Sequence, residues 1–315
     1  MKTMKWLIKR EMWENKGMLL WTPVVISSAV ATLGLVAAFI GKHGDWEVNG
    51  RNIGSVTVEG TARANIADTM AQAYMASSIP LLMVLSFLVF FYCLGALHDE
   101  RRDRSLLFWK SLPVSDLTTV LSKVLMAVVV APLITLGIAV VMSLVILAAG
   151  CMALMAHGTN MFGALLLSPD LYLTPLRMVA LLPVYALWAL PTVGWLLMVS
   201  SWARSKVFLW AVGTPVISAL LMLWAEKGLH LGFDTAWYTA NIVDRILLGV
   251  VPGSWLMFDR VHIMLEHEEH KLAIPQTIFN ESWGTLAGIN VWVGAAAGVA
   301  MIATAVWMRR RREEA

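Results

Sequence analysis

Six consecutive charged residues, Asp99 to Arg104, interrupt an otherwise apolar part of the chain. They belong to residues 97–123, whose sequence is LHDERRDRSLLFWKSLPVSDLTTVLSK. One charged side chain costs roughly 2.5–3.5 kcal/mol at the centre of a bilayer, so burying all six would cost on the order of 15 kcal/mol. The charged block therefore lies in water, between the two long apolar runs that flank it.

A short apolar segment, Leu106 to Leu112, follows the charged block, and Pro113 ends it. We expect this segment to form a short helix with Phe108 and Trp109 exposed on its surface. An exposed aromatic pair suits a docking contact with another protein. It equally suits an interfacial helix whose rings lie among the lipid headgroups. These residues alone do not separate the two alternatives.

The composition is that of an integral membrane protein. The 315 residues are 58% hydrophobic and only 14% charged, with a mean hydropathy of +0.70. Soluble domains are typically about 45–50% apolar and about 25% charged. Both cysteines, Cys93 and Cys151, fall inside apolar runs, where a packing role is favoured over a disulfide or a metal site.

Uncharged runs of membrane-spanning length occur six times along the chain. The predicted spans are 18–40, 73–97, 124–156, 178–203, 207–225 and 282–308. The first is too long for the apolar region of a signal peptide, so we expect an uncleaved span. The third is longer than a bilayer needs, so this helix is either tilted or projects into water. The sequence predicts one all-α transmembrane domain, residues 1–315.

Residues 1–17 are predicted to form an amphipathic helix on the membrane surface. Met4, Leu7 and Ile8 fall on one face of the helix, although Glu11 interrupts it. The opposite sector carries the lysines expected to face anionic lipid, which are Lys2, Lys5, Lys9 and Lys16.

The distribution of Lys and Arg predicts that both termini are cytoplasmic. Sixteen of the 24 lie in four short segments on one side, which are the N-terminus, the loop 98–123, the Arg204–Lys206 hairpin and the C-terminal tail. The external loops are then 41–72, 157–177 and 226–281. Within the last of these, the uncharged residues 246–258 are too few to span, so a re-entrant or interfacial segment is expected.

The loop between the second and third spans resembles that of ABC-2 type transporter permeases. The resemblance rests on Glu100, the pair Ser105-Leu106, the step Leu112-Pro113-Val114-Ser115, and Lys123 at the start of the next helix. It covers about 25 residues, and the six-span layout fits the same family. Arg104 stands where that family often has glycine.

The resemblance implies a cytoplasmic coupling helix in this loop, a separate ATP-binding subunit that holds ATP and Mg²⁺, and a second permease copy. It also implies a bacterial plasma membrane location. The residues expected to contact the ATPase subunit are Glu100, Arg101, Arg102, Asp103, Phe108, Trp109, Lys110 and Pro113.

Several chemistries lack the residues they require. The six spans contain no Asp, Glu, Lys, Arg or His, which argues against an ion-coupled carrier and against an intramembrane enzyme. The chain has no phosphate-binding Gly-x-x-x-x-Gly-Lys-Ser/Thr loop, so no ATPase or other catalytic site of its own is predicted. No cofactor and no nucleic-acid partner is expected.

Two further patterns have a plain structural explanation. His262, Glu266 and His270 recur at helical spacing and are a weak metal-site candidate, but a solvated acidic helix is favoured. Gly294 and Gly298 form one GxxxG pair, which permits a close helix contact without by itself marking a dimer face.

The favoured hypothesis is a permease subunit of an ATP-driven exporter. The alternative is a membrane anchor or sensor that docks a cytoplasmic partner and transports nothing.

Overall fold

The computed structural model describes residues 2–40, 47–48, 51–52, 61–102, 115–156, 158–258 and 274–311, and these are overwhelmingly helical. The helices are α1 (Lys2–Glu14), α2 (Thr22–Ile40), α3 (Thr61–Ala73), α4 (Ile79–Gly95), α5 (His98–Arg102), α7 (Asp116–Leu125), α8 (Ala131–Ala156), α9 (Phe162–Leu167), α10 (Asp170–Ala180), α11 (Leu182–Trp202), α12 (Val207–Gly228), α13 (Thr235–Tyr238), α14 (Asp244–Leu248), α15 (Ser254–Phe258), α16 (Ile274–Gly284) and α17 (Ile289–Arg311). A two-residue antiparallel pairing joins β1 (Glu47–Val48) to β2 (Arg51–Asn52).

Six helical stretches are long and apolar enough to cross a membrane. They are Gly17–Ile40, Arg63–Arg102, Asp116–Ala156, Asp170–Trp202, Val207–Gly228 and Ile289–Arg311. The prediction of a six-span, multi-pass helical protein is therefore confirmed.

Two of these stretches extend well beyond the apolar spans that the sequence predicts. The stretch Arg63–Arg102 has 40 residues and Asp116–Ala156 has 41. At 1.5 Å per residue each is about 60 Å long, roughly twice the thickness of the hydrocarbon layer. The polar ends of both therefore lie outside the hydrocarbon. These ends include α5 and most of α7, which flank the loop predicted to hold a coupling helix.

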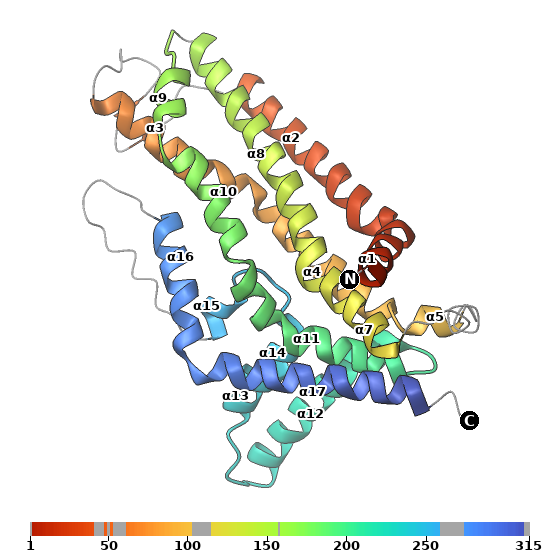
Figure 1. The fold of residues 1–315 in the computed structure, drawn as a ribbon. Coiled ribbons are helices and arrows are strands. Elements are labelled where there is room, and N and C mark those ends of the chain that lie inside the picture. Colours follow the sequence, from red (N-terminus) through yellow and green to blue (C-terminus); the bar gives the residue numbers. More distant parts are fainter. Residues whose placement is uncertain are drawn as a thin grey trace.

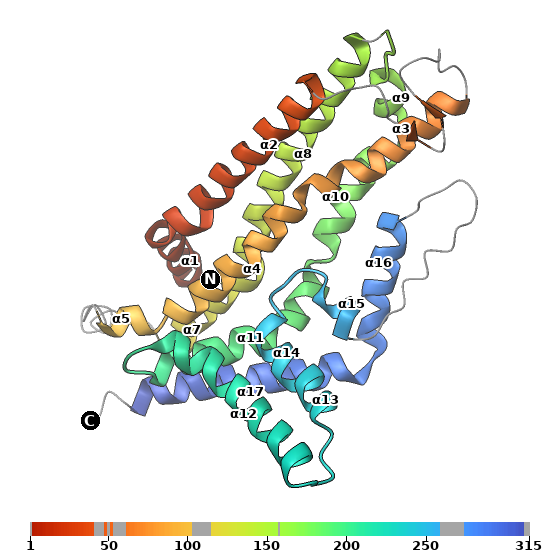
Figure 2. The ribbon, with the colours of Figure 1, turned by 180° about the vertical axis from the view of Figure 1, so that it is seen from behind.

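The long helices form two groups that run in different directions (Figures 1 and 2). In one group α2, α4 and α8 pack side by side, and Leu81, Ala139 and Met142 are buried between them. In the other group α11 lies against α17. The main core joins the groups because α11 also packs on α4, with Trp188 and Leu196 almost wholly buried.

Small residues bring α11 and α17 into close contact. A Cβ atom added at Gly194 would lie 2.5 Å from the carbonyl oxygen of Gly298, and one added at Gly298 would lie 2.6 Å from the carbonyl of Leu190. Only glycine allows backbones to approach this closely. The Cα of Gly294 faces the guanidinium of Arg245 in the same way. The GxxxG pair is therefore used within the chain.

The described residues after α12, 229–258, fold back onto α11 as short helices. Here α13, a π-helical turn and α14 follow one another, and a turn with Gly253 at φ +87° leads into α15. Val250 and Trp255 are buried in the main core, and the Arg245 guanidinium lies 4.5 Å from the Trp188 ring centre. The uncharged residues 246–258 therefore do not cross the molecule as a seventh long helix.

Candidate functional site

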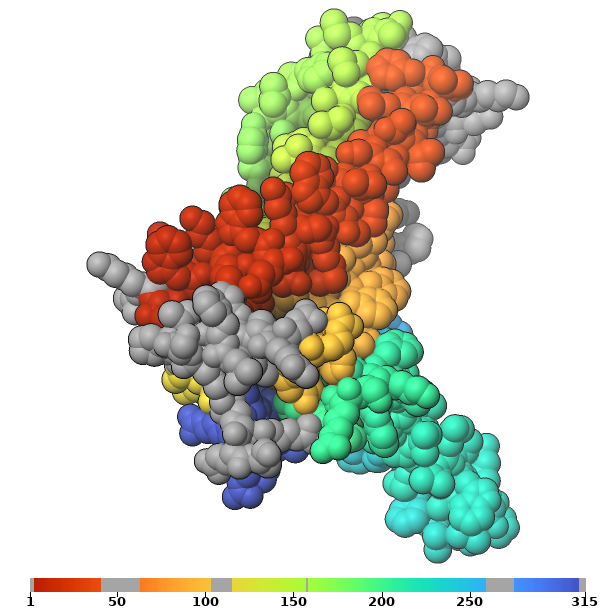
Figure 3. Space-filling model, turned by 90° about the vertical axis from the view of Figure 1, so that its right-hand side faces the viewer, coloured from red at the N-terminus to blue at the C-terminus, as the bar shows by residue number. Residues whose placement is uncertain are grey.

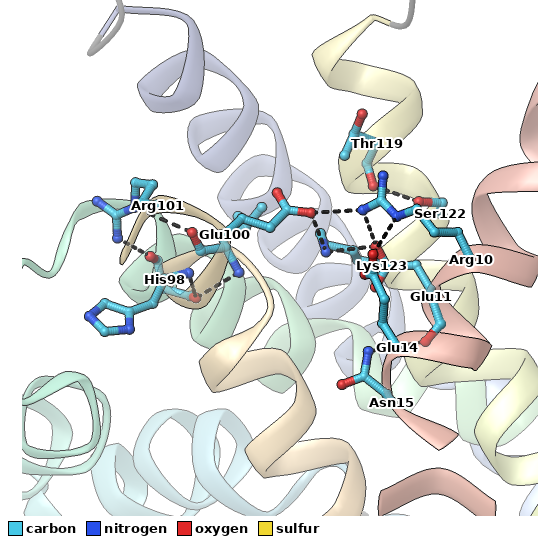
Figure 4. A network of polar contacts seen from close by, with 12 residues as sticks. Arg10, Glu11, Glu14, Asn15, His98, Glu100, Arg101, Thr119, Ser122 and Lys123 are labelled. Atoms are coloured by element: carbon cyan, nitrogen blue, oxygen red, sulfur yellow. Dashed lines mark hydrogen bonds and ion pairs between the residues drawn. The ribbon is translucent and has the colours of Figure 1, made fainter. Parts of the chain in front are cut away.

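Charged side chains converge where α1, α5, α7 and the end of α17 meet (Figure 4). Lys123 lies at the centre, with a side chain only 2% exposed. Its Nζ is 2.8 Å from Oε1 of Glu11 on α1 and 2.9 Å from Oε1 of Glu100 on α5. The hydroxyl of Tyr92 on α4 donates to the other Glu11 oxygen at 3.0 Å. Four helices are thus joined through one ammonium group and its two carboxylates.

Two arginines extend this cluster. Arg10 on α1 places one guanidinium nitrogen 3.0 Å from Oε1 of both Glu11 and Glu100. Arg309, near the end of α17, donates to Oε2 of Glu100 at 3.1 Å and to Oδ1 of Asp116 at 3.0 Å. We call these six residues the ion cluster, and they are Arg10, Glu11, Glu100, Asp116, Lys123 and Arg309.

The ion cluster balances three cations against three carboxylates, which is the condition for keeping charges away from water. Glu100 contacts all three cations of the cluster, which are Lys123, Arg10 and Arg309. Burial acts to raise the pKa of Glu100, but the three cations outweigh burial and the pKa is lowered overall. Glu100 therefore stays ionised at neutral pH.

At the margin of the cluster, Glu14 is 3.2 Å from Arg10 with its side chain 47% exposed. Partial burial raises the pKa of Glu14, and the attraction of Arg10 opposes this only in part. The ionised form of Glu14 is therefore less stabilised than that of Glu100, although both carboxylates contact the same arginine.

The local sequence explains how these residues are positioned. Ser115 caps the start of α7 by accepting a hydrogen bond from the Thr118 backbone N–H at 3.2 Å, so the helix begins at Asp116. Lys123 then lies two helical turns along α7 and points toward α1. On α1, Glu11 lies one turn after Leu7 on the buried face. A charge on that face requires an opposite charge, which Lys123 supplies.

A second set of contacts ties the base of the loop to α11. The hydroxyl of Ser200 accepts hydrogen bonds from the backbone N–H groups of Leu97 and His98 at 3.1 and 3.0 Å. Arg101 on α5 donates to the carbonyl oxygens of Ser200 and Ala203, the latter at 3.0 Å. These carbonyls belong to the last turn of α11, where they lack partners within the helix. The short helix α5 is thus held on one side by the ion cluster and on the other by α11.

The structure describes three of the eight residues of the predicted coupling site. Glu100 and Arg101 point into the molecule and bond to other helices of the same chain, whereas Arg102 is exposed. The remaining predicted contacts lie outside the described residues, and these are Asp103, Phe108, Trp109, Lys110 and Pro113. Contact of any of these residues with an ATPase subunit stays a prediction.

Two of the four lysines predicted to face the membrane surface are exposed on α1, and contact of any of them with lipid stays a prediction. Lys5 and Lys9 are exposed, and Lys9 lies 5.2 Å from the ring centre of Trp6, which is itself 67% exposed. Lys16 lies 5.1 Å from the ring centre of Trp13. Lys2 begins the helix. Cation and indole pairs of this kind are suited to the headgroup layer.

No group of His, Cys, Asp and Glu suited to a metal ion occurs among the described residues. The weak candidate of His262, Glu266 and His270 lies outside them.

Sequence reasoning missed most of the ion cluster. It singled out Glu100 and Lys123 but treated Glu11 as a flaw in an apolar face and Arg309 as part of a basic tail. The available signal was the position of Glu11 itself, since a carboxylate on a buried face is rarely left without a cation.

Comparison with protein-family models, with characterised proteins and with solved structures finds no match. The family resemblance therefore rests on the sequence pattern of the loop and the number of spans.

Proposed function

We propose that this chain is the membrane subunit of an ATP-driven exporter of the ABC-2 type. A separate ATPase subunit binds the loop 98–123 and supplies the energy. Two permease copies form the path for the solute. In this proposal the chain is not itself an enzyme, and it lies in a bacterial plasma membrane with both termini in the cytoplasm.

The observation that carries the proposal is the attachment of α5. A coupling loop must transmit force from its partner to the spans, which requires that its base be firmly held. Glu100 connects α5 to α1, α7 and α17, and Arg101 connects it to α11. A displacement of α5 therefore acts on several long helices at once, rather than on α4 alone.

The ion cluster also agrees with the proposed orientation. The same end of the molecule carries the exposed lysines of α1, the Arg204–Lys206 hairpin and the last residues of α17. Clustering of Lys and Arg at one end of the spans favours the cytoplasmic side. An ATPase subunit has access to ATP only on that side.

The apolar surface of α12 leaves room for a second copy. Only 17% of the most apolar part of α12 is buried, and Leu220, Leu221 and Trp224 are each about 60% exposed. Figure 3 shows α12 and the segment after it standing away from the other helices. This surface is suited to lipid or to another apolar helix surface, as in a permease dimer.

Affinity purification of the tagged chain tests the partner. The wild type is compared with Phe108→Ala/Trp109→Ala in mild detergent, with Phe233→Ala/Trp237→Ala as the matched control for removal of two aromatic rings. Phe233 and Trp237 are 48% and 55% exposed, so their loss leaves the fold intact. We expect an ATPase subunit with the wild type and the control, and its loss with the loop variant. Failure to recover an ATPase with any of the three would contradict the proposal.

The anchor or sensor alternative uses the same docking loop and is separated by the behaviour of the assembled complex. A transporter raises its ATPase rate when a transported solute is added, because solute binding and ATP hydrolysis are coupled. An anchor leaves the rate unchanged for every solute. Measuring ATPase activity of the reconstituted complex against a panel of amphiphilic solutes distinguishes them.

A further inference from the structure

An open pocket lies at the same end of the molecule as the ion cluster, where α11 ends, α12 begins and α17 ends. Its volume is about 410 Å³, and its walls are Trp202, Trp307, Met308 and Arg311. Figures 1 and 2 both show the end of α17 beside the connection between α11 and α12. Ser201 donates to the sulfur of Met308 at 3.6 Å, which holds the two helix ends together.

The walls of the pocket combine indole rings with a cation. The Arg311 guanidinium lies 4.2 Å from the ring centre of Trp307, and the Trp202 ring lies 5.1 Å from that of Trp210. Trp307 and Trp210 are 49% and 47% exposed. Tryptophans at the ends of apolar helices lie at the depth of the lipid headgroups. A pocket with these tryptophans in and beside its walls is therefore suited to the headgroup layer.

The cations near the pocket have no ion-pair partner among the described residues. Arg204, Lys206 and Arg310 are exposed. Neither these three cations nor Arg311 forms an ion pair with another described residue. This differs from Arg309, one residue before Arg310, which is matched by two carboxylates. The pocket is suited to an anion from outside the chain.

We propose that this pocket binds the phosphodiester headgroup of an anionic phospholipid. Arg311 and the Arg204–Lys206 hairpin hold the phosphate, and the acyl chains lie along the exposed Phe208 and Leu209 at the start of α12. The volume is within the range of small-ligand pockets, about 300–1,000 Å³. Basic pockets between the ends of transmembrane helices recognise such headgroups. The proposal stands whether or not the chain transports a solute.

Retention of lipid by the purified full chain tests this site. The protein is reconstituted with equal amounts of phosphatidylglycerol and phosphatidylcholine, extracted in mild detergent, and its bound lipids are counted by native mass spectrometry. The variants are Arg311→Gln, Arg311→Lys and the double variant Arg204→Gln/Lys206→Gln. The matched control is Lys227→Gln, an exposed lysine at the opposite end of α12.

We expect the ratio of bound phosphatidylglycerol to phosphatidylcholine to fall about fivefold for each cation removed near the surface. Arg311→Lys retains most of the preference, and Lys227→Gln leaves it unchanged. Because Arg311, Arg204 and Lys206 are exposed, all variants fold, which an unchanged melting temperature verifies. An equal ratio in wild type, Arg311→Gln and the double variant overturns the proposal. Full displacement of the lipid by soluble glycerol phosphate also overturns it, since the site would then recognise a free phosphate ester.

Discussion

The helix α17 is attached to the rest of the molecule in two chemically opposite ways. In its middle, Gly298 packs against Gly194 and Leu190 with no charge and almost no side chain between the backbones. At its end, Arg309 contacts Glu100 and Asp116 in a network of charges. The first contact depends on shape, and the second depends on matching charges. Removal of one partner therefore has different consequences at the two places.

Lys123→Met is expected to have the largest effect. It removes one of the two cations that Glu11 and Glu100 share, which leaves three carboxylates with two cations. Removing one member of a buried ion pair costs about 3–5 kcal/mol. Denaturant unfolding of the purified chain in detergent measures this loss. Lys227→Met, at an exposed position, is the matched control and should unfold as the wild type does.

A compensating change sharpens this comparison. Lys123→Met/Glu11→Gln removes one carboxylate together with the lysine, so two cations again face two carboxylates, and Glu100 keeps Arg10 and Arg309. We expect part of the lost stability to return. If the double variant is as unstable as the sum of the two single changes, the charges do not act as one cluster.

Gly298→Ala is expected to have the second largest effect, through overlap of atoms and not through charge. The new methyl group would lie 2.6 Å from the Leu190 carbonyl, so α11 and α17 must separate. Overpacking of this kind costs about 1–3 kcal/mol. Gly137→Ala in α8 is the control, because nothing lies within 4 Å of its added methyl group. Equal unfolding of the two variants would show that the glycine contact does not limit the approach of the helices.

Arg101→Gln should weaken the molecule less, by about 1 kcal/mol, because it removes hydrogen bonds to the end of α11 from a partly exposed side chain. The ion cluster remains intact in this variant. Hydrogen exchange at residues 200–203 measures the effect, which should appear as faster exchange there without a change in α1. Faster exchange across α1 as well would show that the two attachments of α5 are not independent.

The smallest effect is expected from pH near neutrality. A lowered pKa in the folded state means that Glu100 stabilises the fold fully above its ordinary value of 4.5, and that this stabilisation is lost as the pH falls through the lower, folded value. The contribution of Glu100 to the melting temperature should therefore not change with pH between pH 8 and pH 5. Below pH 5 the melting temperature of wild type should fall as Glu100 takes up a proton, and Glu100→Gln should lack this part of the fall. A change at pH 6–7 that Glu100→Gln abolishes would contradict the assignment.

The six spans could be predicted because the bilayer imposes one simple condition, which is an uncharged run of sufficient length. The ion cluster could not, because its central contact joins Glu11 and Lys123, which are 112 positions apart in the chain. A charge on an apolar face indicates that an opposite charge lies nearby, but the sequence does not show which one. The contact between Gly194 and Gly298 was hidden for a related reason, since a GxxxG pair permits close approach without naming the partner helix.

The continuous stretch Asp116–Ala156 also has a mechanical consequence. It runs from the ion cluster to the far end of the molecule over a length of about 60 Å, so a tilt of about 5° at one end would displace the other by about 5 Å. The stretch is not a uniform rod, however, because a π-helical turn at Met126–Val130 is followed by Pro132. A π-helical turn and a proline are common sites of bending in a long helix, so the same tilt reaches the far end only to the extent that these residues stay rigid.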